Sequence, residues 1–208
     1  MTTTFSGRKT LGCKEELDFL RWVNAQVGWE CLPYGQGLLP NKTKDALRDS
    51  AFNGDAELLE LIICRMPSDM RNVYMDFYPD GFPVFMRWLP DWLITFRGNA
   101  VFTADSKTGA TRHLNWAIEM SSLLGGIIQQ LLGVPSVYVF PPAGCRDYRT
   151  VASPNELIVA RNKVFDGKNA IGSGTPYITV PKRDVACSLR HLMTKYEQGA
   201  AVIDGVFL

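Results

Sequence analysis

The first third of the chain carries hydrophobic residues at helical spacing. Leu17, Leu20, Val23 and Val27 recur every three or four residues, and Gly28 follows where a left-handed residue often ends a helix. This pattern predicts an amphipathic helix. Glycine- and proline-containing sequence then predicts an ordered loop, and two shorter hydrophobic segments joined by an Asn-Gly turn predict a helical hairpin. The helix is predicted over residues 14–27, the loop over residues 29–40 and the hairpin over residues 43–66.

The middle of the chain changes to the two-residue period of a half-buried strand. Large hydrophobic side chains stand at Trp92, Ile94 and Phe96, so they share one face of an extended segment. A two-residue connection at 98–99 and a second extended segment at 101–103 complete a predicted antiparallel hairpin. The hydrophobic face of this hairpin requires cover from a helix or a partner.

The longest hydrophobic stripe at helical spacing lies over residues 111–132 and is followed by Gly133 and Pro135, which end helices. We expect this segment to form the central core helix. A short strand is predicted after it, over residues 137–140, where a pair of prolines ends the extended segment.

Ser153, Pro154 and Glu156 give the strongest local signal in the chain. A serine N-cap, a proline at the first helical position and a glutamate at the third form a capping box. A helix is therefore predicted to begin here and to run to residue 165. The remaining predicted elements are a strand over residues 177–180 and a helix over residues 184–198.

These elements predict an α+β fold with a helical N-terminal third, a central antiparallel β-hairpin and a long core helix packed on a small mixed sheet. The sequence contains no low-complexity linker, so we expect a single compact domain over residues 1–208. Residues 200–208 are too hydrophobic to form a free end. We expect this tail, and the N-terminal arm over residues 1–12, to dock on neighbouring chains.

Composition and charge narrow the function classes. The chain has 208 residues, of which 46% are hydrophobic and 21% charged, and 22 lysines and arginines against 21 aspartates and glutamates leave a net charge of +1. The hydrophobic content excludes a disordered chain, and the small net charge argues against a dedicated nucleic-acid binder. The sequence contains neither a run of about 20 apolar residues nor a secretory signal. We therefore expect no membrane span, no signal-peptide secretion, and a cytoplasmic or virion location.

Cys145 is the most enzyme-like residue of the sequence, because the guanidinium of the neighbouring Arg146 favours a thiolate. A phosphatase loop of the CX5R type needs an arginine six positions after the cysteine, where Val151 stands. His113 or His191 would have to supply the base, and only the fold can bring either imidazole to the thiol.

Metal sites are not predicted. Cys187 and His191 share one face of the predicted last helix, but two ligands do not complete a tetrahedral site. The five cysteines are odd in number and widely spaced, which argues against a disulfide framework. Paired carboxylates such as Glu15 and Glu16 stand near predicted helix starts, where the helix dipole favours negative charge. We therefore expect no metal and no cofactor.

The sequence leaves two function hypotheses. The first is a non-enzymatic structural or assembly subunit of a larger complex, such as a virion coat or connector protein. Its partners would be copies of itself or other subunits, without sequence-specific binding of nucleic acid. The alternative is a small cysteine-dependent hydrolase or ligand-binding domain that uses the Cys145 loop, with His113 or His191 as the base. The assembly hypothesis assigns interface roles to six hydrophobic residues, Phe5, Trp92, Phe96, Phe102, Phe207 and Leu208.

Overall fold

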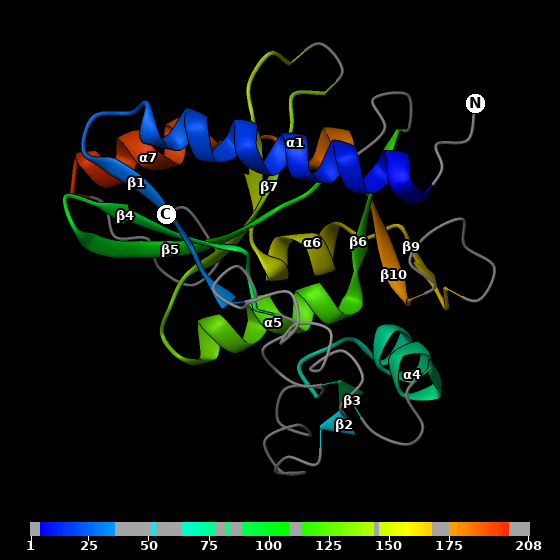
Figure 1. Cartoon of the computed structure of the whole chain (residues 1–208). Coiled ribbons are helices and arrows are strands. Elements are labelled where there is room, and N and C mark those ends of the chain that lie inside the picture. Colours follow the sequence, from blue (N-terminus) through cyan, green and yellow to red (C-terminus); the bar gives the residue numbers. More distant parts are fainter. Residues whose placement is uncertain are drawn as a thin grey trace.

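The computed structural model describes residues 5–35, 51–52, 64–77, 82–83, 89–108, 114–143, 146–167 and 175–199. These residues form an α+β fold in which helices cover both faces of a mixed six-stranded sheet (Figure 1). The strand order is β1-β4-β5-β7-β8-β11. The strands are β1 (Trp29–Pro33), β4 (Trp92–Phe96), β5 (Asn99–Ser106), β7 (Ser136–Phe140), β8 (Thr150–Ala152) and β11 (Cys187–Ser188).

Strands β5 and β7 run parallel, whereas the other neighbouring strands of this sheet are antiparallel. A parallel pair needs a crossover connection. The chain leaves β5, forms strand β6 (Asn115–Glu119) and helix α5 (Met120–Leu131), and returns to the sheet as β7. Helix α5 therefore lies across one face of the sheet and begins near the end of β5.

Two hydrophobic clusters fill the space between the sheet and its helices. Helices α1 (Phe5–Asn24) and α7 (Leu189–Glu197) pack on one face, and α5 and α6 (Pro154–Ala160) pack on the other. Strand β7 is buried on both sides, because successive side chains of a strand point to opposite faces. Val137 and Val139 contact the cluster under α1 and α7, whereas Tyr138 and Phe140 contact the cluster under α5.

A second sheet of three strands lies beside α5 in the order β6-β10-β9. Its inner face contributes Trp116, Ile118, Ile178 and Val180 to the cluster under α5. Helix α4 (Ser68–Phe77) contacts β9, and β2 pairs with β3. The bounds of the other elements are β9 (Lys163–Phe165), β10 (Tyr177–Pro181), β2 (Ala51–Phe52), β3 (Phe82–Pro83) and the 3-10 turn η3 (Lys182–Asp184).

Several predicted elements are confirmed. Strands occupy 92–96, 136–140 and 177–181, where strands over 92–96, 137–140 and 177–180 are predicted. The capping box is also present: the Ser153 hydroxyl accepts a hydrogen bond from the Glu156 amide at 3.2 Å, and the Glu156 carboxylate accepts one from the Ser153 amide at 2.7 Å.

The prediction of a helix over residues 111–132 is wrong for residues 115–119. These residues form β6, because their alternating Trp116 and Ile118 side chains pair with β10 inside the core. The helix that follows has 12 residues, so the long core helix is not confirmed. The predicted loop over residues 29–40 contains a strand, β1, which pairs with β4.

The last third of the chain also differs from the prediction. Helix α6 ends at Ala160 rather than near residue 165, because residues 163–165 pair with β10. Helix α7 begins at Leu189, because residues 187–188 pair with β8.

The helical N-terminal third is not confirmed. Residues 51–52 form a strand, and most of the predicted hairpin over residues 43–66 lies outside the described residues. Residues 1–4 of the predicted arm and the tail over residues 200–208 lie outside them as well. Within the described ranges, the helices are too short or too polar to cross a membrane.

Candidate functional site

A polar group lies between the end of β5 and the first turn of α5. Asp105 lies in β5 and Lys107 directly follows the last residue of that strand, and both side chains reach Ser122 of α5. Lys107 Nζ donates hydrogen bonds to Asp105 Oδ2 at 2.8 Å and to Ser122 Oγ at 2.9 Å. The Ser122 hydroxyl in turn donates to the same Asp105 oxygen at 2.6 Å. The three side chains therefore form a closed triangle of charge-assisted hydrogen bonds.

The β4–β5 hairpin brings a second carboxylate to this triangle. A β-bulge near the turn adds one residue to β5 and shifts the pairing by one position, so that Trp92 lies opposite Ala104. Asp91 directly precedes β4, and its charge acts on both Lys107 and Tyr138, whose pKa values it raises. We call Asp91, Asp105, Lys107 and Ser122 the carboxylate–lysine cluster.

Tyr138 forms the floor of the carboxylate–lysine cluster. It pairs with Asp105 across the parallel β5–β7 ladder and lies buried under α5. Its hydroxyl donates a hydrogen bond to the Ser122 carbonyl oxygen at 2.6 Å. The Lys107 Nζ lies 5.5 Å from the centre of the Tyr138 ring, within the range of a cation–π contact. These contacts fix the lysine from three sides.

The electrostatics of the cluster keep Lys107 charged. Burial alone would lower the pKa of Lys107, but the carboxylates of Asp105, Asp91 and Glu119 raise it above its ordinary value. Burial, with the charge of Asp105, raises the pKa of Tyr138 well above its ordinary value, so its hydroxyl stays protonated. The side chains of Lys107 and Asp105 are 19% and 13% exposed. The cluster is thus largely shielded but still open to solvent at its edge.

The residues of the cysteine hypothesis are not brought together in the described part of the chain. Cys145 and His113 lie outside the described residues. His191 lies exposed on α7, and Cys187 lies at the end of β11. Burial, and then the charge of Glu156, raises the pKa of Cys187 to about 11, so its thiol is protonated at neutral pH.

Among the six predicted interface residues, Phe102 lies in the core. It is 1% exposed in the cluster under α1 and α7. Trp92 and Phe96 are half-buried against the same cluster, where the Phe96 ring lies 4.9 Å from that of Trp29. The side chain of Phe5, at the start of α1, and the residues Phe207 and Leu208 are outside the described set. The assembly hypothesis therefore stays a proposal.

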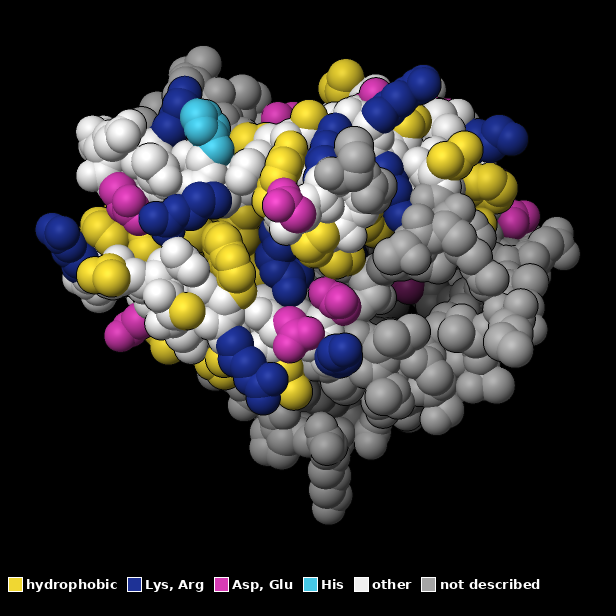
Figure 2. Space-filling view, turned by 90° about the horizontal axis from the view of Figure 1, so that it is seen from above, with side chains coloured by type: hydrophobic (Ala, Val, Ile, Leu, Met, Phe, Trp, Pro, Cys, Tyr) yellow, Lys and Arg dark blue, Asp and Glu magenta, His cyan; other side chains and the backbone are white. Residues whose placement is uncertain are grey.

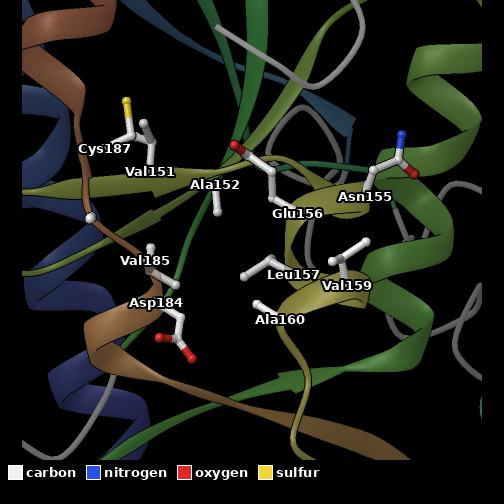
Figure 3. A pocket seen from close by; sticks show the side chains of 11 residues that line it. Val151, Ala152, Asn155, Glu156, Leu157, Val159, Ala160, Asp184, Val185 and Cys187 are labelled. Atoms are coloured by element: carbon white, nitrogen blue, oxygen red, sulfur yellow. The ribbon is translucent and has the colours of Figure 1, made fainter.

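A cavity of about 500 Å³ lies between β8, α6 and the segment that leads into β11 (Figure 3). Val151, Leu157 and Val185 give it apolar walls. The carboxylate of Glu156 lines it, but this group already caps α6. The protonated thiol of Cys187 gives the cavity no nucleophile, so we do not place catalysis there.

The surface over α1 and α7 shows basic, acidic and hydrophobic side chains interspersed (Figure 2). This distribution agrees with the net charge of +1 and provides no field of one sign on that face.

Sequence reasoning missed the carboxylate–lysine cluster, although a signal was present. Asp91 directly precedes the first strand of the predicted hairpin, and Asp105 and Lys107 follow the second predicted strand. Residues placed symmetrically about a hairpin turn meet at its open end. The register of the β4–β5 pair includes a bulge, which the sequence pattern does not reveal.

Comparisons of the chain with protein-family models, curated proteins and solved structures find no match.

Proposed function

We propose that the protein hydrolyses phosphate esters with a divalent metal ion bound at the carboxylate–lysine cluster. The observation that carries this proposal is the ion pair of Asp105 with the charged Lys107 at a shielded but accessible edge of the sheet, with the charge of Asp91 acting on the same lysine. Carboxylates attract hard cations, and a fixed ammonium attracts phosphate oxygens. A site with both charges suits an anionic substrate that binds together with a metal cation. The carboxylates would hold the cation, and the ammonium would contact the anion.

Asp91 and Asp105 would hold the metal ion. The two hydrogen bonds to Asp105 both use Oδ2, which leaves Oδ1 outside that triangle. Within the described ranges, no group of three or more His, Cys, Asp and Glu side chains is arranged to hold a metal. Mg²⁺ commonly binds through one or two carboxylates and completes its shell with water and substrate phosphate oxygens. The cluster therefore fits Mg²⁺ or Mn²⁺ better than a structural zinc ion.

Lys107 would act as an electrostatic group rather than as a base. Because the carboxylates hold its pKa above the ordinary value, it carries no free electron pair at neutral pH. Its charge can stabilise the negative charge that grows on the phosphoryl oxygens when water attacks phosphorus and the ester oxygen leaves. A bound metal ion would lower the pKa of that water and so supply the nucleophile.

The same charge argues against Ser122 as a nucleophile activated by Lys107. That mechanism needs a neutral amine to take the serine proton. Here the Ser122 hydroxyl donates to Asp105 and accepts from the Lys107 ammonium. Ser122 is therefore better suited to positioning Asp105 and Lys107.

Hydrolysis assays with isosteric variants test this proposal. The full chain is incubated with Mg²⁺ or Mn²⁺ and with single-stranded DNA, duplex DNA, RNA or bis(p-nitrophenyl) phosphate. We expect cleavage that EDTA stops, and a loss of about 100-fold or more in kcat/KM for Asp105→Asn and Lys107→Met. Asp76→Asn, the same change at an exposed position of α4, is the matched control and should keep the wild-type rate.

Circular dichroism melting curves show whether each variant is folded. Wild-type rates in folded Asp105→Asn and Lys107→Met would contradict the proposal, and so would the absence of metal-dependent cleavage of every ester by the wild type.

A further inference from the structure

A row of three side chains crosses the outer face of the small sheet. Tyr177 of β10 pairs with Glu119 of β6 on one side and with Phe165 of β9 on the other. Residues paired across neighbouring strands point to the same face. The adjacent positions Ile118 and Ile178 point into the core, so Glu119, Tyr177 and Phe165 point outward.

Two aromatic rings of this row form a parallel stack. The ring centres of Phe165 and Tyr177 lie 4.8 Å apart, and their planes differ by 8°. Phe165 is 37% exposed, so its ring is available to a further flat group. Lys163 stands two positions before Phe165 on the same face of β9 and is also exposed. An exposed aromatic stack suits a flat ligand. The ammonium of Lys163 at the Phe165 end of the row would attract a phosphate, whereas the carboxylate of Glu119 at the other end would repel one.

The row leads to the carboxylate–lysine cluster. Glu119 is the residue before α5 and stands three positions before Ser122, whose hydroxyl accepts a hydrogen bond from Lys107. Neighbouring strands lie about 4.8 Å apart, so Phe165, two strands away, lies about 10 Å from Glu119. Each nucleotide of a stacked strand advances about 3.4 Å along the helix axis. The separation of Phe165 and Glu119 therefore corresponds to about three nucleotides, so a phosphate near the start of α5 and a base on Phe165 can belong to one short oligonucleotide.

We propose that Phe165 and Tyr177 form a stacking site for an unpaired nucleobase, which makes single-stranded nucleic acid the substrate of the cluster. The inference rests on the proposed hydrolysis for the position of the phosphate. Every nucleobase offers a flat π face, so the stacking is tolerant of sequence. Bases in a duplex are already stacked on their neighbours, so the site selects single strands.

The stacking site is tested by measuring how tightly the full chain binds a labelled single-stranded DNA of about 12 nucleotides. Binding is measured by fluorescence anisotropy in EDTA. We expect Phe165→Ala and Phe165→Leu to weaken binding about 5- to 140-fold, the range found when one stacking aromatic is removed. Leucine retains hydrophobic volume without a π face, whereas Phe165→Trp retains the ring and should bind as the wild type does. Tyr148→Ala, which removes an exposed aromatic elsewhere, is the control and should not change the affinity.

Equal affinity of the wild type and folded Phe165→Leu overturns the inference, and so does tighter binding of duplex than of single strands. The two proposals fail separately. If only the stacking site is wrong, metal-dependent cleavage still requires Asp105, and Phe165→Leu leaves KM for the single strand unchanged. If only the hydrolysis is wrong, no ester is cleaved, while binding of the single strand still requires the Phe165 ring.

Discussion

Replacing Lys107 by methionine should show how much the ion pair with Asp105 contributes to the free energy of unfolding. Lys107 Nζ lies 2.8 Å from Asp105 Oδ2, and both side chains are less than one-fifth exposed. At an effective dielectric constant of about 20, the gross attraction at this distance is about 6 kcal/mol, most of which offsets desolvation. Removing one partner of a buried pair costs about 3–5 kcal/mol, and the partial exposure here favours the lower end. We therefore expect Lys107→Met to lower the free energy of unfolding by about 3 kcal/mol.

A double-mutant cycle with Asp105→Asn measures the interaction energy between Lys107 and Asp105 apart from their contacts with other residues. Each single variant leaves one member of the ion pair without the other, whereas the double variant removes both charges. The cost of the double variant should fall short of the sum of the single costs by about 2 kcal/mol. The measurement is urea unfolding at neutral pH in EDTA, followed by circular dichroism.

Addition of Mg²⁺ to the same variants links stability to the proposed function. A metal ion on Asp105 replaces the missing positive charge, so Mg²⁺ should stabilise Lys107→Met more than the wild type and should not stabilise Asp105→Asn. At 100 times the dissociation constant the gain is about 2.7 kcal/mol. Costs that add within about 0.5 kcal/mol would refute the charge coupling. Unchanged unfolding in Mg²⁺ for every variant would refute the metal site.

Two further predictions concern the core. Burial raises the pKa of the Cys31 thiol from 9.0 to about 12, so the unfolded chain loses this proton at lower pH than the folded chain. The free energy of unfolding should therefore fall by about 1.4 kcal/mol per pH unit between pH 9 and 12, and Cys31→Ala should remove that part of the slope in urea titrations; equal slopes would contradict it. At Gly126, a Cβ would lie 2.7 Å from Pro154 Cγ and 2.8 Å from the Tyr138 hydroxyl oxygen. Gly126→Ala should cost about 1–3 kcal/mol in the same assay through overpacking between α5 and α6, and an unchanged urea midpoint would show that the helices can separate freely.

The elements that local sequence could predict are those whose side chains act locally. The Ser153 and Glu156 side chains bond to backbone groups within four residues, so the capping box was visible without the fold. The strand over residues 92–96 could also be predicted, because large hydrophobic side chains at every second position are typical of a half-buried strand. Residues 115–119 instead have a strand pattern directly joined to a helical one, and only their pairing with β10 separates the two.

The cluster could not be predicted because its neighbours are set by register. The turn of the hairpin is Arg97-Gly98, both with positive φ, rather than the predicted connection at 98–99. The bulge adds one residue to β5, so that Trp92 pairs with Ala104 rather than with Thr103. A register shift of one residue changes which side chains lie opposite each other across the hairpin, and the composition of the chain does not reveal it.

Because the chain has almost no net charge, we expect it to bind a nucleic acid through few phosphate contacts. A strand bound through a basic groove releases one set of counterions per neutralised phosphate, and for single strands log K falls with log salt by about 0.7 per phosphate. The proposed site offers Lys107 and Lys163 to phosphates and Phe165 to a base, so we expect a slope of about −1.4. Anisotropy titrations of the single strand at increasing NaCl measure this slope. A slope several times steeper would mean that a basic surface elsewhere on the chain dominates binding, and the stacking site would then not be the main determinant of affinity.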